Sequence, residues 1–113
     1  MVVVNGIKSC DSVKKAIKFL KDNSIEYTFR DFKAEPVGCD EIKKWLEKSD
    51  INKLFNTRGT TYRKLNLKEL NLSDNDKIDW LCRENLLIKR PVIQDQTDII
   101  VGYDKELYEM ELL

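Results

Sequence analysis

The first residue of this chain that could carry chemistry is Cys10, in the stretch NGIKSCDSVKKAI at residues 5–17. An apolar run ends before it and a helical pattern begins after it. A side chain at such a turn faces the free N–H groups of the helix and the positive end of its dipole, and both favour the thiolate over the thiol. Nearby Lys8 adds positive charge, whereas Asp11 opposes it. Since the thiolate attacks disulfides and other electrophiles, Cys10 is a candidate nucleophile.

A structural role is the alternative for Cys10. The residue could fill the turn as a small side chain or cap the helix weakly, although Asp11 and Ser12 are better caps. The chain contains no histidine, which removes a Cys-His pair and a Ser-His-Asp triad. Any activation of this thiol would therefore come from lysine, arginine, backbone N–H groups or the helix dipole.

The other two cysteines, Cys39 and Cys82, lie outside CxxC spacing of any other cysteine. Cys82 falls on an apolar helix face, where we expect buried filler. Cys39 lies near a helix start and could take a resolving or regulatory role. Three scattered thiols without an imidazole argue against a metal site. They also do not make a disulfide framework, and without an export signal we expect a reducing cytoplasm.

Basic residues in two later segments could meet an anion. Arg58, Arg63 and Lys64 lie in a polar, turn-rich stretch and could bind an anion or a glutathione carboxylate. Isolated charges also commonly form a solvated loop, so that alternative stays open. Arg90 stands directly before Pro91 and a strand-like run, which is a more specific context.

Length and composition describe an ordinary folded domain. The chain has 113 residues, of which 42% are apolar and 35% charged, so a packed core is expected rather than disorder. Twenty basic residues balance twenty acidic ones, and this gives no global field for nucleic acid or an anionic membrane. The longest apolar run, Met1–Val4, is far too short to span a bilayer.

Apolar spacing predicts alternating strands and helices. The run at residues 2–7 is β-branched and short, which is typical of a buried strand. After Asp11, apolar residues return at i, i+3, i+4 and i+7, as in an amphipathic helix. Ser73 and Asp76 have capping-box spacing, and the last helix should turn Leu107 and Met110 inward. The predicted strands are 2–7, 25–32, 92–94 and 99–101, with a turn at 95–98, and the predicted helices are 11–23, 51–55 and 72–85, with others beginning near 40 and 104.

This order of βαβ unit, helical middle, β-hairpin and helix is that of an α/β, thioredoxin-like fold. We predict one such domain over residues 1–113. A cis proline commonly precedes the third strand of that fold and faces the active cysteine, and Pro91 occupies that place. A cis bond would carry Arg90 toward Cys10. The alternative is a trans proline that begins an edge strand.

Four segments together resemble the ArsC/Spx family across nearly the whole chain: GIKSCDSVKKA, EPVGCDEIKKWL, NTRGTTYRKLN and LLIKRPVIQDQTDIIVGYD. Within it, the chain is similar to the small YffB-type branch of thiol reductases. The resemblance implies a thioredoxin-like fold with a helical insertion and a redox-active Cys10. It also implies anion-stabilising roles for Arg63, in YRKL, and Arg90, in KRP, with Arg58 of NTRGT in support.

Departures from the family's motifs narrow the expected chemistry. The resemblance implies a third arginine near residues 101–104 for arsenate reduction, and none is there. Asp11 would also repel a doubly charged oxyanion beside the sulfur, so a thiol-disulfide reaction fits better. The CxxC switch of the Spx branch would need a cysteine where this chain has Val13. The shared VGYD segment still leaves an Spx-like interaction module open.

The leading hypothesis is a cytoplasmic, glutathione-dependent thiol reductase with no metal and no bound cofactor. Glutathione is the expected co-substrate, and glutathione or glutaredoxin the expected partner, without direct nucleic-acid or membrane binding. The alternatives are an Spx-like regulator that binds the RNA polymerase α subunit and, third, an arsenate reductase. The expected catalytic residues are Cys10, Arg63 and Arg90, and the expected substrate-binding residues are Lys8, Arg58 and Pro91.

Overall fold

A computed structural model of the chain describes residues 1–96 and 98–113. The described chain forms two compact units, and each is treated separately below. The first joins Met1–Glu35 to Arg90–Leu113, and the second is Pro36–Lys89. That the whole chain acts as one domain stays a prediction. No helix in these described ranges is long and apolar enough to cross a membrane.

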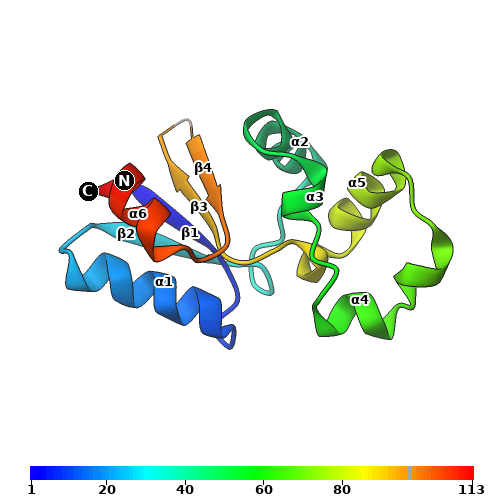
Figure 1. The fold of residues 1–113 in the computed structure, drawn as a ribbon, viewed down its shortest axis with the longest axis horizontal. Helices are drawn as coiled ribbons and strands as arrows, with labels where there is room; N and C mark the ends of the chain where they lie inside the picture. Colours follow the sequence, from blue (N-terminus) through cyan, green and yellow to red (C-terminus); the bar gives the residue numbers. More distant parts are fainter. Residues whose placement is uncertain (97) are drawn as a thin grey trace. The chain divides into compact units, whose positions relative to one another are not determined.

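A four-stranded sheet forms the centre of the first unit (Figure 1). Its strand order is β2-β1-β3-β4. β1 is parallel to β2 and antiparallel to β3, which is antiparallel to β4. This arrangement confirms the predicted thioredoxin-like α/β fold. The predicted turn at 95–98 includes Thr97, which lies outside the described residues. The elements are β1 (Val2–Gly6), α1 (Asp11–Asp22), β2 (Tyr27–Asp31), β3 (Val92–Asp95), β4 (Asp98–Val101) and α6 (Lys105–Leu112).

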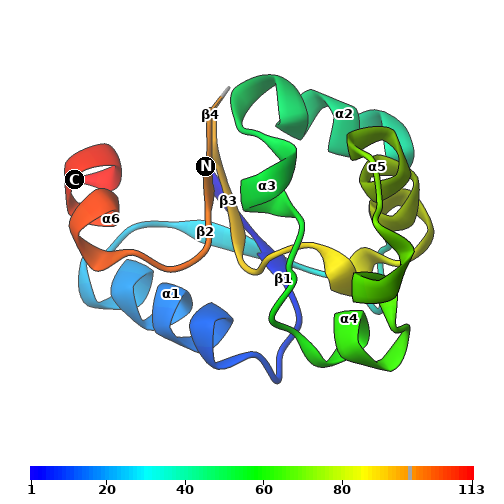
Figure 2. The ribbon, with the colours of Figure 1, turned by 45° about the vertical axis from the view of Figure 1, so that its right-hand side comes forward.

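α1 and α6 cover the same face of this sheet, as Figures 1 and 2 show. Their buried side chains form one apolar cluster with alternate residues of β1 and with one residue each of β3 and β4. Tyr108 is the α6 residue at its centre, with Phe19 of α1 packed edge-on against it at 5.5 Å. Met110 was predicted to point inward and is 76% exposed, so that prediction was wrong. The buried stripe of α6 runs through Tyr108 because its large ring occupies the space against α1.

The second unit is helical. The predicted capping box of α5 is present: Asp76 N–H donates to Ser73 Oγ, and Ser73 N–H donates to Asp76 Oδ2. α4 and η1 fall where sequence analysis predicts only a polar, turn-rich stretch. α4 has no buried residue, so it carries no apolar face that would reveal a helix. The elements are α2 (Cys39–Lys48), α3 (Ile51–Leu54), α4 (Thr60–Lys64), η1 (Leu67–Leu70), α5 (Asp74–Arg83) and η2 (Asn85–Leu87).

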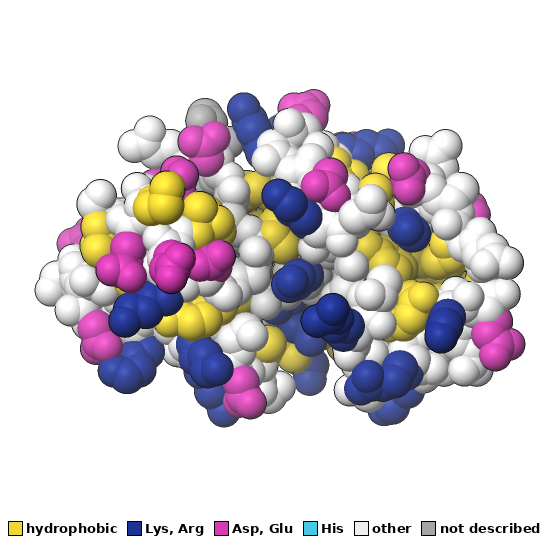
Figure 3. Space-filling view, viewed as in Figure 1, with side chains coloured by type: hydrophobic (Ala, Val, Ile, Leu, Met, Phe, Trp, Pro, Cys, Tyr) yellow, Lys and Arg dark blue, Asp and Glu magenta, His cyan; other side chains and the backbone are white. Residues whose placement is uncertain are grey.

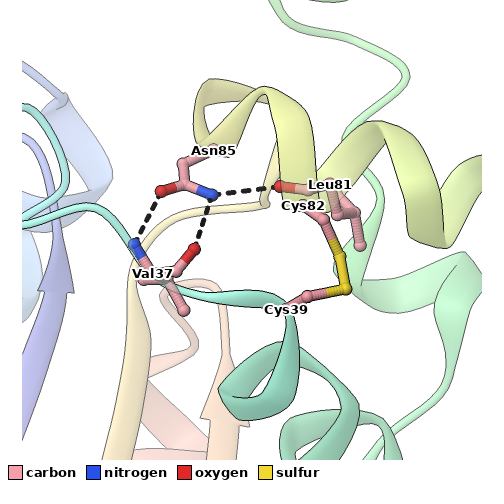
Figure 4. The surroundings of a disulfide bond; sticks show 5 residues. All are labelled: Val37, Cys39, Leu81, Cys82 and Asn85. Carbon is pink, nitrogen blue, oxygen red and sulfur yellow. Dashed lines mark hydrogen bonds between the residues drawn. A yellow bond between two sulfur atoms is a disulfide. The ribbon is translucent and has the colours of Figure 1, made fainter.

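A disulfide joins Cys39 at the start of α2 to Cys82 in the last turn of α5 (Figure 4). The two Cα atoms are 4.9 Å apart, well within the range that a disulfide spans. The prediction that Cys82 is buried filler was therefore wrong, since its sulfur is bonded to that of Cys39. α2 and α5 are in contact, and the start of α2 meets the end of α5 so that the two sulfur atoms can bond.

The join between β1 and α1 depends on Gly6. A Cβ atom at this position would lie 2.6 Å from Cγ2 of Val13, which is fully buried in α1. Non-bonded carbon atoms in proteins do not approach each other this closely, and the valine side chain is stiff. The absence of a side chain at Gly6 therefore lets α1 pack directly against the end of β1.

Replacing Gly6 with alanine should destabilise the first unit. Overpacking of this kind costs about 1–3 kcal/mol because Val13 or the start of α1 must shift. We expect the free energy of unfolding, from urea denaturation followed by circular dichroism, to fall by that amount. Gly38→Ala is the matched control, since no atom lies within 4 Å of its Cβ position. Equal stability losses in the two variants would contradict this account of Gly6.

Candidate active site

Cys10 lies at the N-cap of α1 in extended backbone conformation. Its carbonyl accepts a hydrogen bond from Lys14 N–H at 3.0 Å, and its own N–H donates to Ile7 O at 3.3 Å. Its side chain makes no capping hydrogen bond. The better caps, Asp11 and Ser12, lie inside the helix instead, so the cap position falls to the cysteine. The sulfur is thereby placed at the end of α1 where backbone N–H groups lack helical partners.

The Cys10 thiol is free and half-buried, with the side chain packed against the apolar cluster of the first unit. It is the one cysteine in the described ranges outside a disulfide. Lys8 lies two residues earlier in an exposed turn, and Asp11 begins the helix. The Cys10 side chain therefore contacts the core and is partly accessible to solvent, which a nucleophile needs.

The Arg90-Pro91 peptide bond is cis, as the thioredoxin-like fold predicts. Pro91 is buried and Arg90 half-buried. In the sheet register, Val92 at the start of β3 lies opposite Asn5 near the end of β1. Strand β3 therefore begins at the end of the sheet where β1 leads into the turn that carries Cys10. The structure thus brings the Arg90-Pro91 segment and the Cys10 turn to the same end of one sheet.

A buried side chain of β1 reinforces that pairing. Asn5 is fully buried, and its Nδ2 donates to Val92 O at 2.9 Å and to Gln94 Oε1 at 2.8 Å. These bonds add side-chain links to the backbone ladder between β1 and β3. Asn5 therefore helps to fix the start of β3 beside the end of β1.

Hydrogen bonds from Tyr108 and Gly102 hold the proline segment in place. Tyr108 donates its hydroxyl hydrogen to Gly102 O at 2.6 Å, and Gly102 N–H donates to Pro91 O at 2.7 Å. Gly102 has φ of 85°, a conformation that favours glycine. Burial, with smaller effects of Tyr103 and Asp104, raises the pKa of the Tyr108 hydroxyl, which therefore stays a donor. A continuous chain of hydrogen bonds thus runs from the apolar cluster to Pro91.

In the second unit, Arg63 lines a hollow of about 400 Å³. Its Nη1 donates to Arg58 O at 3.0 Å, and Arg58 N–H donates to Asn56 Oδ1 at 3.0 Å, so these bonds hold the two arginines together. Figure 3 shows Lys and Arg side chains gathered over the α4 part of this unit. Arg63 and Lys68 offer positive charge to an anionic group in this hollow, beside the carboxylate of Glu69. The other lining residues are Thr57, Tyr62 and Asn66.

The predicted site residues therefore fall into two groups. Cys10, Lys8, Arg90 and Pro91 belong to the first unit, and Arg58 and Arg63 to the second. Sequence reasoning missed the support that Tyr108 and Gly102 give to Pro91, although the VGYD segment contained that glycine. It also missed most of the polar residues around Arg63, since α4 and η1 were not predicted. In the described ranges no group of three His, Cys, Asp or Glu residues could hold a metal ion.

The fold and the free cysteine at the start of α1 define a protein of the thioredoxin-like class. The chain belongs to the ArsC family, whose model matches residues 5–110. It is 35% identical to the uncharacterized protein YusI of Bacillus subtilis, over 88% of each chain. It is 31% identical to the global transcriptional regulator Spx of Listeria innocua, over 94% of this chain and 82% of Spx. A solved structure named as a YffB protein aligns over 100% of both chains, with a TM-score of 0.91 and 30% identity.

The Tyr108 hydroxyl should make stability fall at high pH. Because its pKa is raised in the folded state, the unfolded chain loses this proton first as pH rises. The contribution is intact below the ordinary tyrosine pKa of about 10 and is lost above it, at up to about 1.4 kcal/mol per pH unit. Tyr108→Phe should flatten the pH dependence of urea denaturation above pH ~10. Parallel curves for the two proteins above that pH would contradict the assignment.

Proposed function

We propose that the protein is a glutathione-dependent thiol reductase that uses Cys10 as its single nucleophile. The observation that carries the proposal is the free, half-buried Cys10 at the N-cap of α1, whose side chain makes no capping hydrogen bond. Backbone N–H groups without helical partners and the helix dipole stabilise negative charge at such a position. Membership of the ArsC family supports the same chemistry at the level of the family.

The proposed reaction begins when the Cys10 thiolate attacks the glutathionyl sulfur of a mixed disulfide on a substrate thiol. The substrate leaves as a thiolate and takes up a proton, and Cys10 becomes bonded to glutathione. A second glutathione thiolate attacks that glutathionyl sulfur, which releases glutathione disulfide and restores Cys10. The substrate gains two electrons, and two glutathione units leave joined as a disulfide. The proposal includes the cytoplasmic location predicted from the sequence, where glutathione would be the co-substrate.

Two arginines supply positive charge in the proposed mechanism. Arg90 is proposed because it lies in the cis-proline segment, which is at the same end of the sheet as the Cys10 turn. Arg63 is proposed because it lines the hollow of the second unit, where its Nη1 donates to Arg58 O. We propose that Arg90 stabilises negative charge on the attacking thiolate and that Arg63 binds an anionic group of glutathione. Lys8 and Pro91 are proposed to help bind the substrate.

Glutathione disulfide should modify Cys10 in the native protein. We expect one glutathione adduct per chain by intact-protein mass spectrometry, placed on Cys10 by peptide mapping, and removed again by excess reduced glutathione. The adduct should be lost in Cys10→Ser. A native protein that forms no adduct at Cys10, or whose adduct excess glutathione does not remove, would overturn the proposal.

Loss of either arginine should slow turnover. We expect Arg63→Ala and Arg90→Ala each to lower kcat/KM for reduction of a glutathionylated peptide by about tenfold or more, since charge stabilisation is lost. Lys48→Ala, which removes one exposed charge at the end of α2, is the matched control and should keep full activity. An effect of Lys48→Ala as large as that of the arginine variants would reduce the arginine effects to net charge alone.

The Spx relatives favour a second candidate, a non-catalytic regulator. In that case the chain would bind a partner such as the RNA polymerase α subunit, and Cys10 would not turn over. A pull-down with the isolated C-terminal domain of this polymerase partner distinguishes the two candidates. Binding that survives Cys10→Ser, together with no thiol turnover, would favour the regulator. Turnover without binding would favour the reductase.

A further inference from the structure

We propose that Cys39 and Cys82 form a second thiol-disulfide exchange site, which opens and closes reversibly with a low-molecular-weight thiol such as glutathione. The site is separate from Cys10 in chemistry, because each half of the pair resolves the other. This inference does not rest on the proposed function of Cys10.

The two cysteines are held close by contacts that do not involve sulfur (Figure 4). Asn85 follows α5, and its Oδ1 accepts from Val37 N–H at 2.7 Å. Its Nδ2 donates to Val37 O at 3.2 Å and to Leu81 O at 3.0 Å. One side chain thus ties the residue two before Cys39 to the residue just before Cys82. The Cα separation of 4.9 Å should therefore outlast loss of the disulfide.

The helices that carry the cysteines also pack against each other. α2 and α5 are in contact, and each has a buried face, formed by Ile42 and Trp45 in α2 and by Leu81 in α5. Reduction of the disulfide leaves these faces in place. A pair that stays preassembled closes as an intramolecular reaction, which has a high effective concentration. A preassembled pair therefore differs from a disulfide whose reduction lets its two cysteines move apart.

An attacking thiol can reach the bond. Cys39 and Cys82 are both half-buried rather than enclosed. The residue before Cys39 is the exposed Gly38, whose Cβ position has no atom within 4 Å, so there is open space beside the start of α2. Exchange needs such access as well as a favourable geometry.

The exchange balances with glutathione as the reductant. One glutathione thiolate attacks a sulfur of the Cys39–Cys82 bond and forms a mixed disulfide, while the other cysteine leaves as a thiolate. A second glutathione thiolate attacks the glutathionyl sulfur of the mixed disulfide and leaves as glutathione disulfide. The protein gains two electrons and two protons, and two glutathione molecules are oxidised. Closure is the same sequence in reverse, with glutathione disulfide as the oxidant.

A redox titration of Cys10→Ser tests the site without interference from Cys10. The protein is equilibrated in buffers of graded reduced and oxidised glutathione, starting from either state, then alkylated and analysed by mass spectrometry. We expect one two-electron transition at the same position from both directions, with native circular dichroism throughout. A pair that never closes, opens only on unfolding, or gives different end points from the two directions would overturn the proposal.

Two further variants sharpen the test. Cys39→Ser in the same background should trap a glutathione adduct on Cys82 and should form no internal bond. In Asn85→Ala the disulfide should open at an about tenfold lower ratio of squared glutathione to glutathione disulfide, because the three hydrogen bonds that hold the pair together are lost. Thermal unfolding of reduced Asn85→Ala shows whether it is folded. A folded Asn85→Ala with an unchanged transition would overturn the role given to Asn85.

Discussion

The close approach of Gly6 to Val13 is the constraint on which the candidate site depends. Only hydrogen fits at position 6, since a Cβ atom would lie 2.6 Å from the buried valine. α1 can therefore begin at Asp11, within five residues of the end of β1. A turn this short leaves Cys10 at the N-cap, with its sulfur at the end of the helix that attracts negative charge. The position of the proposed nucleophile thus depends on the absence of a side chain at Gly6 in the preceding strand.

The Arg90-Pro91 segment at the same end of the sheet comes from a part of the chain far from Cys10. Asn5 ties β1 to β3, so the start of β3 stays beside the end of β1. Tyr108 donates to Gly102 O, and Gly102 N–H in turn donates to the carbonyl of Pro91. Both sets of bonds begin at buried side chains, Asn5 and Tyr108. The apolar core therefore determines the position of the Arg90-Pro91 segment, which exposed residues alone would hold loosely.

The sequence predicted the elements whose apolar pattern reflects burial of one regular face. The apolar spacing of α1 and the β-branched run of β1 predicted both elements, since each buries a regular face. Sequence reasoning failed where local patterns compete with tertiary contacts. Tyr108 displaced Met110 from the core because its ring packs on Phe19, and α4 has no buried face to detect. The pairing of Cys39 with Cys82 across 43 residues depends on how α2 meets α5, which no local pattern encodes.

The central claim is that the fold makes Cys10 a nucleophile rather than a filler of its turn. The most direct measurement is the rate of iodoacetamide alkylation of Cys10 at pH 7, in the native protein and in the same protein unfolded in urea. Peptide mapping would report Cys10 alone. The account predicts that the native thiol reacts about tenfold faster or more, since the free N–H groups at the start of α1 stabilise negative charge on the attacking sulfur. Native alkylation as slow as, or slower than, that of the unfolded chain would contradict it.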